Sequence, residues 1–228
     1  MLGVALVSLV AAACTRTPTP TPHAIAAPSV IETVVPAARA PASALLEPLD
    51  PILQWGQWRG PVATGEGPRA DPPITWSEDR GVAWKTTIGG RGNSSPVVWG
   101  DRVFLTTAIP SGAPVAPIPE RDPGAHDNMP SIQAQRFVVM ALDRTTGQVA
   151  WTTDVRQERP HEGTHVTGSW ASASPVTDGE HLFASFGSRG LYGLTLGGEV
   201  LWQLDLGDMQ TKHGHGEGSS PTIHGETL

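Results

Sequence analysis

Short apolar runs separated by glycine turns recur along the chain and predict β-hairpins. Three segments share one order: Ser-Pro, three further residues, Gly, an acidic residue, and then apolar positions. These segments are residues 95–105, 174–184 and 220–228. A glycine beside an acidic residue, between apolar runs, is typical of a tight turn. Each segment is therefore predicted to form a β-hairpin.

A second short pattern places a tryptophan in a predicted strand. It occurs at residues 82–85, 149–152 and 200–203, and Thr-Gly or Gly-Gly precedes the last two copies. Residues 137–142 and 190–196 lie between each hairpin and its tryptophan and are also typical of strands. One unit is therefore predicted to contain four strands. Ser174 and Ser220 are 46 residues apart, which is close to the length of one propeller blade.

A single four-stranded unit cannot bury both of its faces. Radial stacking of such units buries the faces and leaves only short edges, and the recurring tryptophans would supply apolar contact area between neighbours. We therefore predict an all-β fold, a partial β-propeller of four-stranded blades. A β-sandwich is the alternative, but it does not account for the recurring tryptophans.

The two predicted units differ in length, and a third is only begun. Residues 109–135 are rich in proline, lack apolar periodicity, and are predicted to be a surface loop inserted into the first unit. The sequence stops early in the second strand of the third hairpin. Because closed propellers use about four to eight blades, we expect a fragment of a longer protein.

The sequence Ala-Leu-Asp-Arg-Thr-Thr-Gly-Gln-Val-Ala-Trp at residues 141–151 resembles a family motif. It is similar to the tryptophan-docking motif of the pyrroloquinoline quinone (PQQ) repeat propellers, Ala-x-Asp-x-x-Thr-Gly-Lys-x-x-Trp, with Gln148 in place of the lysine. The copy that ends at Trp202 lacks the aspartate. The resemblance extends from about residue 54 to the end and implies blade-docking roles for five residues. They are Trp84, Asp143, Gly147, Trp151 and Trp202.

Composition narrows the class of protein. Gly (26) and Pro (22) are abundant among the 228 residues, which suits turn-rich β-structure better than helices. The formal net charge is −7 and lysine is scarce. A nucleic-acid groove requires clustered basic side chains, so we expect no nucleic-acid partner.

The N-terminal residues predict export. Residues 1–14 form an apolar stretch that is too short to span a bilayer and is typical of a secretory signal. The end of this stretch, Val-Ala-Ala-Ala-Cys, resembles a bacterial lipobox, which implies lipidation of Cys14, the only cysteine. An ordinary signal peptide is the alternative.

Three predicted regions follow from these patterns. Residues 1–14 are a lipoprotein signal peptide, residues 15–50 a disordered linker rich in Pro, Ala and Thr, and residues 51–228 the propeller repeats. We expect the protein on the periplasmic side of the cell envelope, either secreted or held by a lipid anchor at the outer membrane.

Histidine-rich loops precede the innermost predicted strands and give candidate metal ligands, because imidazoles and carboxylates bind divalent metals. The candidates are His161, His165, His213, His215 and Glu217. Residues 161–165 match the metalloprotease string His-Glu-x-x-His, but Pro160 and Gly163 disfavour the helix that this string requires. Solvated loops are the alternative, and a metal-dependent hydrolase would depend on these histidines alone.

The family resemblance leaves two functions open. The first is a non-enzymatic scaffold that binds envelope proteins or a small ligand, similar to the BamB lipoproteins. The second is a quinoprotein alcohol or sugar dehydrogenase with PQQ and Ca²⁺, although the vicinal cysteine pair of many such enzymes is absent. If PQQ bound, four residues of the same loops would be its candidate contacts. They are Arg91, Asn93, Ser169 and Trp170.

Overall fold

The computed structural model describes residues 49–228, which lie in one compact unit, Glu47–Leu228. The described part is built from β-strands, and its helices are three short 3₁₀ turns. They are η1 (Pro51–Leu53), η2 (Gly187–Arg189) and η3 (Lys212–Gly214). The predictions for the signal, for Cys14 and for the linker up to residue 48 lie outside the described residues. No helix within the described range is both long and apolar enough to cross a membrane.

The first sheet has the predicted four strands, and all its neighbouring pairs are antiparallel. In spatial order they are β1 (Val97–Trp99), β2 (Arg102–Ser111), β4 (Ala134–Asp143) and β5 (Val149–Glu158). β4 is central in the sheet and covered on both faces, so seven of its ten residues are buried. The sheet therefore contributes a continuous apolar layer.

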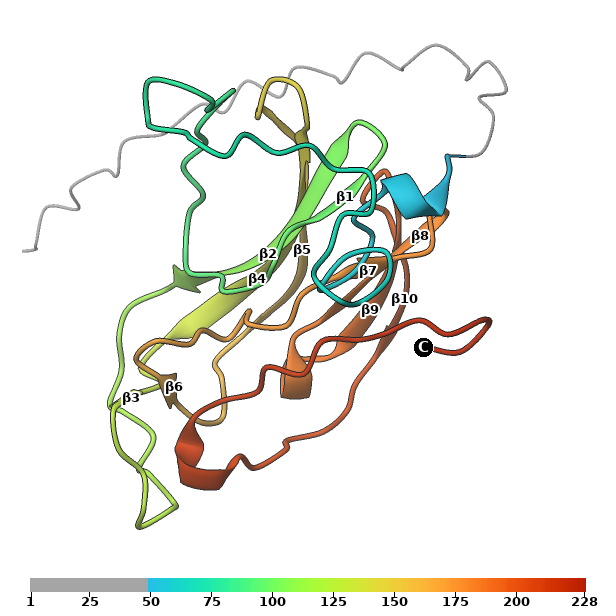
Figure 1. Ribbon diagram of the computed structural model, residues 1–228. Coiled ribbons are helices and arrows are strands. Elements are labelled where there is room, and N and C mark those ends of the chain that lie inside the picture. Colours follow the sequence, from blue (N-terminus) through green and yellow to red (C-terminus); the bar gives the residue numbers. More distant parts are fainter. Residues whose placement is uncertain (1–48) are drawn as a thin grey trace, which may run out of the picture. The chain divides into compact units, whose positions relative to one another are not determined.

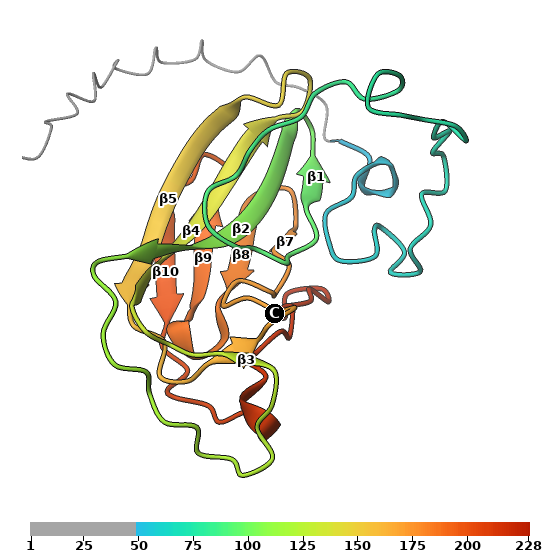
Figure 2. The same cartoon turned by 90° about the vertical axis from the view of Figure 1, so that its left-hand side faces the viewer.

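The second sheet repeats the same order of strands. In chain order they are β7 (Val176–Thr177), β8 (His181–Ser185), β9 (Leu191–Thr195) and β10 (Val200–Leu204), and each pairs with the next. Figure 2 shows this sheet (orange) stacked behind the first (green to yellow), with β1 and β7 at one side and β5 and β10 at the other. The two sheets are successive blades of a β-propeller, open in the described part of the chain.

The core lies between the two blades. Phe104 and Phe137 from the first blade and Leu182, Tyr192 and Leu194 from the second are all at most 2% exposed. They belong to a single cluster of buried side chains. Burying a large apolar side chain contributes about 1.5–3 kcal/mol, so this shared core is the main term that holds the blades together.

The tryptophan contacts between repeats have one geometry. Trp84 lies against Gly147, where an added Cβ would be 2.4 Å from the indole ring, and its Nε1 donates to the Arg144 carbonyl at 2.9 Å. The Thr86 hydroxyl donates to the Gly147 carbonyl at 2.6 Å. Only glycine fits here, since its φ is +70° and the ring occupies the space of a side chain.

The second docking contact repeats the first atom by atom. The Trp151 Nε1 donates to the Leu196 carbonyl at 3.1 Å, and the Thr153 hydroxyl donates to the Gly198 carbonyl at 2.7 Å. A Cβ on Gly198 would lie 2.7 Å from the Trp151 ring. Trp-x-Thr is therefore the unit that docks, a feature that the tryptophan pattern alone did not reveal.

Trp84 packs on the turn at residues 143–147, called the Asp-Thr-Gly turn after Asp143, Thr146 and Gly147. The side chain of Asp143 closes this turn. The Asp143 carboxylate accepts from the Thr145 and Thr146 backbone N–H groups and from the Thr146 hydroxyl, at 2.8–3.0 Å. In the degenerate copy, the Thr195 hydroxyl takes this part and accepts from the Glu199 N–H at 3.1 Å. A hydroxyl therefore replaces the missing aspartate as the cap of the turn.

The first tryptophan segment differs from the prediction, and the docking role of Trp202 stays a prediction. Trp202 is 39% exposed and lies over Gly193 of its own sheet, so it docks on no other blade within the described residues. Residues 82–85 form no strand, because no neighbouring backbone pairs with them. Trp84 nevertheless makes the docking contact. The contact therefore depends on the tryptophan and threonine side chains and not on pairing of the segment as a β-strand.

The insert and the third hairpin also need correction. β2 and β4 extend into the predicted loop and pair as far as Ser111 and Ala134, and the insert contains β3 (Asn128–Met129), paired with β6 (Thr164–His165). Residues 220–228 form a turn with one isolated bridge between His224 and Thr227 instead of a hairpin. A strand needs a paired neighbour, and this segment has none within the described range.

Candidate functional site

Three loops meet where the innermost strands of the blades begin. The Ser95 backbone N–H donates to the Ser174 hydroxyl, and the Ser174 N–H donates to the Ser220 hydroxyl, both at 2.9 Å. The Asn93 N–H donates to the Ala171 carbonyl at 3.1 Å. The serines of successive Ser-Pro pairs are therefore hydrogen-bonded to one another, and the loops that precede the pairs are brought together.

The small sheet β3–β6 joins the insert to the histidine loops, as Figure 1 shows at its lower left. The His165 N–H donates to the His215 carbonyl at 3.1 Å, so the second and third loops also pair directly. The Arg91 guanidinium crosses from the first loop to the Val166 carbonyl and to the Met129 sulfur. Side chains from all three loops and the insert therefore share one region.

A buried arginine is the principal cation of this region. The Arg189 side chain is 5% exposed and forms ion pairs with Glu158 and Asp208. Its backbone carbonyl accepts from the Tyr192 hydroxyl at 2.6 Å, which fixes η2 against the core, and burial raises the pKa of Tyr192. A guanidinium stays charged when buried, so these carboxylates have a permanent counter-ion.

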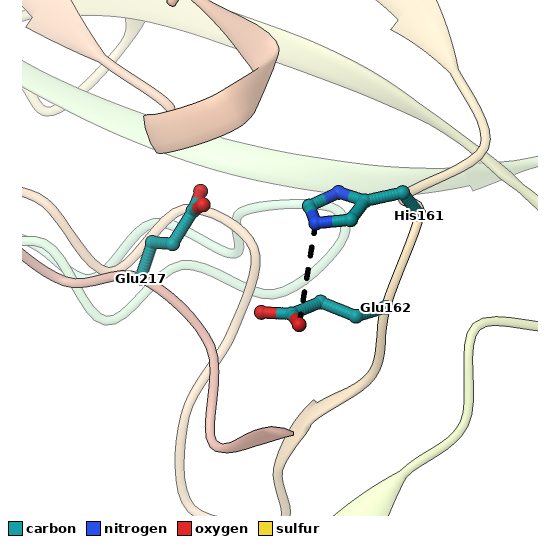
Figure 3. A group of neighbouring side chains, drawn as sticks. All are labelled: His161, Glu162 and Glu217. Atoms are coloured by element: carbon teal, nitrogen blue, oxygen red, sulfur yellow. Dashed lines mark ion pairs between the residues drawn. The ribbon is translucent and has the colours of Figure 1, made fainter. Parts of the chain in front are cut away.

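Beside Arg189 lies a group of three potential metal ligands, His161, Glu162 and Glu217 (Figure 3). One donor atom of each lies within 4.8 Å of the others, and the His161 Nε2 is 4.0 Å from a Glu162 oxygen. All three side chains are half-buried. The sequence predicted His161 and Glu217 as ligands, and Glu162 joins them because it follows His161 on the same loop.

Each of these groups already has protein partners. The His161 Nε2 donates to the Met209 carbonyl at 2.7 Å, and its Nδ1 lies 3.2 Å from the Arg189 guanidinium, a donor. Glu162 accepts from the Thr211 hydroxyl at 2.7 Å, and Glu217 accepts from the Ser188 hydroxyl and N–H. A metal ion would have to displace these donors next to a buried cation.

A second cluster consists of four imidazole rings. The ring centroids of His126 and His215 are 4.9 Å apart, those of His213 and His215 are 5.6 Å apart, and those of His126 and His213 are 5.8 Å apart. His165 lies 5.0 Å from His215. Three of these four rings belong to the predicted ligand set. His126, in the insert, was missed because nothing in the sequence places residue 126 beside residue 215.

The imidazole cluster contains unpartnered polar atoms. The His213 Nδ1 and the His215 Nε2 are buried and have no hydrogen-bond partner. The closest acid is Asp122, whose Oδ2 lies 3.6 Å from the His213 Nδ1 and accepts from the His213 backbone N–H at 2.7 Å. The backbone N–H groups of Gly124 and His213 lower the pKa of Asp122, so its carboxylate is charged at neutral pH.

Two open cavities lie in this region, and the first borders both clusters. One of about 490 Å³ is lined by Glu120 and Asp122 from the insert, by Glu162, and by Thr211 and neighbouring residues of the third loop. The other, of about 600 Å³, is lined by Ser95, Ser174 and Ser220, the serines that are hydrogen-bonded from one repeat to the next. Both are open to solvent and have mixed polar and apolar linings, which suits a hydrated ligand or a protein segment.

The four candidate quinone contacts do not share a cavity. Asn93, Arg91 and Trp170 each line a different one, and the Ser169 side chain is buried. The Asn93 amide donates to the Thr167 carbonyl at 2.8 Å, and the Trp170 Nε1 donates to the Glu162 carbonyl at 3.2 Å. Asn93 and Trp170 thus have protein hydrogen-bond partners, and the role of the four residues as PQQ contacts stays a prediction.

Comparison with known proteins identifies the family. No curated protein matches the chain. The family model described as outer membrane protein assembly factor BamB matches residues 70–227, more than half of the chain and including both blades. The matched range contains both docking tryptophans, the Asp-Thr-Gly turn and the three Ser-Pro segments. The chain therefore belongs to the PQQ-repeat β-propeller family that this model describes.

Proposed function

We propose that this protein is a non-enzymatic scaffold of the cell envelope that binds other envelope proteins. The observation that carries the proposal is the match of residues 70–227 to the model of an outer membrane protein assembly factor. Membership of a propeller family does not by itself assign an activity, because the same repeats serve enzymes and binding proteins. The proposal therefore also needs a surface that can bind protein.

Within the described residues, the exposed edge of the second blade offers such a surface. All five residues of β10 are exposed, and Leu201 and Leu204 are 48% and 52% exposed. An unpaired edge strand presents backbone N–H and C=O groups that an extended segment of another protein can pair with, while the exposed apolar side chains add contact area. These features support protein binding more directly than they support turnover of a small substrate.

Site-specific photo-crosslinking in the source cells tests this function. A photoreactive residue at Leu201 or Leu204 should capture a component of the β-barrel assembly machinery of the outer membrane. The same residue at Glu66, which is exposed in the segment before the first blade, is the matched control. Equal labelling of all three positions, or capture of no envelope protein, contradicts the proposal.

The quinoprotein dehydrogenase is the rival, and it has its own test. The purified chain is titrated with PQQ and Ca²⁺ and assayed for alcohol- or sugar-dependent reduction of a dye. The scaffold proposal predicts neither a change in quinone absorbance nor dye reduction. Saturable binding with substrate-dependent reduction would replace the scaffold by an enzyme.

We further propose that Cys14 carries a lipid that holds the protein at the envelope. The lipobox-like sequence before this cysteine supports the anchor. Substitution Cys14→Ala should move the protein from the membrane fraction to the soluble fraction, because no other acylation signal is present in that stretch. Unchanged membrane association, with no fatty-acid labelling of the parent, contradicts the anchor.

A further inference from the structure

The imidazole cluster, and not the His161 group, is where the described residues have unused ligand capacity. Both nitrogens of His161 are occupied by Met209 and Arg189, whereas the buried His213 Nδ1 and His215 Nε2 have no hydrogen-bond partner. A buried polar atom without a partner costs about 1–3 kcal/mol. A bound cation removes that cost at the imidazole cluster and would add a displacement cost at His161.

The third ring is already set up as a ligand. The His126 Nδ1 lies 2.8 Å from the Gly124 carbonyl. A carbonyl only accepts, so Nδ1 carries the proton and Nε2 keeps its lone pair. Donation of one ring N–H to a backbone carbonyl is the usual arrangement around a metal-binding histidine, because it fixes the tautomer and the plane of the ring.

The spacing of the rings fits one ion. With Zn–N bonds of about 2.1 Å and tetrahedral angles, two imidazoles on the same ion have centroids about 5 Å apart. The three separations among His126, His213 and His215 are 4.9, 5.6 and 5.8 Å. Among the described residues only the His161 group already has three donor atoms within 4.8 Å, so binding at the imidazole cluster includes a turn of the rings onto the ion.

A carboxylate completes the set. Asp122 lies 3.6 Å from the His213 Nδ1, and the backbone of Gly124 and of His213 holds its carboxylate in place. Glu120 adds negative charge nearby through Asn128, and Lys212 is the adjoining positive charge. His165 is the poorer ligand, because its Nδ1 accepts from the Thr167 N–H at 3.2 Å.

We propose that His126, His213, His215 and Asp122 bind a zinc-like divalent ion that ties the insert of the first blade to the loop after the second. Three nitrogens and one oxygen suit zinc or cobalt, whereas Mg²⁺ and Ca²⁺ prefer oxygen ligands only. Four protein ligands make a closed, structural site. The site is separate from β10, so it does not depend on the proposed scaffold function.

Metal titration of the full-length chain, purified without a histidine tag and treated with chelator, tests the site. Zn²⁺ should bind at one ion per chain by calorimetry, and Co²⁺ should give the visible absorption of a tetrahedral complex. His213→Gln and His126→Gln should each weaken Zn²⁺ binding at least about tenfold. Because His126 is exposed, His126→Gln decides the matter if His213→Gln fails to fold.

Two control variants sharpen the test. His181→Gln, in the second blade, and His161→Gln, in the neighbouring cluster, should bind Zn²⁺ as the parent does. The proposal is overturned if the parent shows no saturable binding, or if both cluster variants bind like the parent. It is also overturned if His161→Gln abolishes binding, which would place the ion at the other cluster.

Discussion

The outermost strands of the two blades carry the same tryptophan in opposite situations. On β5, Trp151 is half-buried, its indole N–H has an acceptor in the next blade, and its ring covers Gly198. On β10, Trp202 is 39% exposed and lies over Gly193 of its own sheet. The residue type is the same, so the difference comes from whether a neighbouring turn is present to receive the ring.

This comparison separates the blade from the docking unit. Trp84 makes the same contacts as Trp151 although its segment forms no strand, and the threonine two positions later is hydrogen-bonded in both cases. In the third copy Leu204 stands where Thr86 and Thr153 stand in the others. Docking therefore depends on the contact between a Trp-x-Thr segment and a glycine turn. It does not require that the segment form a β-strand.

Truncation of the two tryptophans should give the largest difference. Trp151→Ala removes a ring packed between the blades and should lower the free energy of unfolding by about 3 kcal/mol. Trp202→Ala, the matched control, should cost less, about 1 kcal/mol, because its side chain is 39% exposed and its ring lies on its own sheet instead of between blades. Urea unfolding followed by circular dichroism measures both. Equal costs would mean that Trp151 gains nothing from the second blade.

Glycine substitution should come next in size. Gly198→Ala forces a side chain into a φ of +89° and into the Trp151 ring, and should cost about 2–3 kcal/mol. Gly207 also has a positive φ, +71°, but nothing lies within 4 Å of its added Cβ. Gly207→Ala should therefore cost about 1 kcal/mol, from backbone strain alone. Indistinguishable midpoints in urea would contradict the contact between ring and turn.

The serine link between the blades should have a smaller effect. Ser174→Ala leaves the Ser95 N–H without its acceptor and should cost about 1–2 kcal/mol, because Ser174 is 3% exposed. Ser111→Ala removes the acceptor of an exposed Gln157 amide and is the matched control, with an expected cost near zero. Thermal unfolding of the pair checks this. A neutral Ser174→Ala would show that water replaces the link.

The smallest expected effect is a difference in how stability depends on pH between the two turns on which the tryptophans pack, the turn with Asp143 and the turn with Thr195. Backbone and hydroxyl donation from Thr146 lowers the pKa of Asp143, whereas the corresponding turn of the second blade is capped by the neutral Thr195. A lowered folded-state pKa means that the stabilisation is complete above the unfolded value, about 4, and is lost as the pH falls through the folded value.

Asp143→Asn should therefore flatten the acid limb of the stability curve below about pH 4, while Thr195→Ala should leave its slope unchanged. Urea midpoints measured between pH 2 and pH 7 check both variants. An acid limb that keeps its slope in Asp143→Asn would assign the pH dependence to other carboxylates, such as Asp178, whose pKa is also lowered because donation from His181 and Glu180 outweighs its desolvation.

The sequence predicted those features of the fold that recur from one repeat to the next. The two four-stranded sheets, the motif at residues 141–151 and the meeting of the Ser-Pro segments follow from local patterns that recur. The pairing of residues 109–111 with residues 134–136 was missed because proline content argued for a loop, yet Pro110 needs no donor where it lies in β2.

The candidate clusters were harder to predict because they join single residues across long separations. His126 meets His215 only because the insert folds back through β3, and no periodicity marks that return. Arg189 is the last residue of η2, in a sequence typical of an ordinary turn, and its burial arises from the packing of Tyr192 and the surrounding carboxylates. The His126–His215 contact and the burial of Arg189 both result from tertiary packing, which local sequence patterns do not encode.

A double-mutant cycle between Trp151 and Gly198 tests the central idea of this account, that an indole ring seated on a glycine turn adds to the shared core in holding neighbouring blades together. Unfolding free energies of Trp151→Ala, Gly198→Ala and the double variant give the coupling energy. We expect Gly198→Ala to cost at least about 1 kcal/mol less once the ring is gone, and no such relief when Trp202→Ala replaces Trp151→Ala. Strictly additive effects of the Trp151 and Gly198 substitutions would contradict the account.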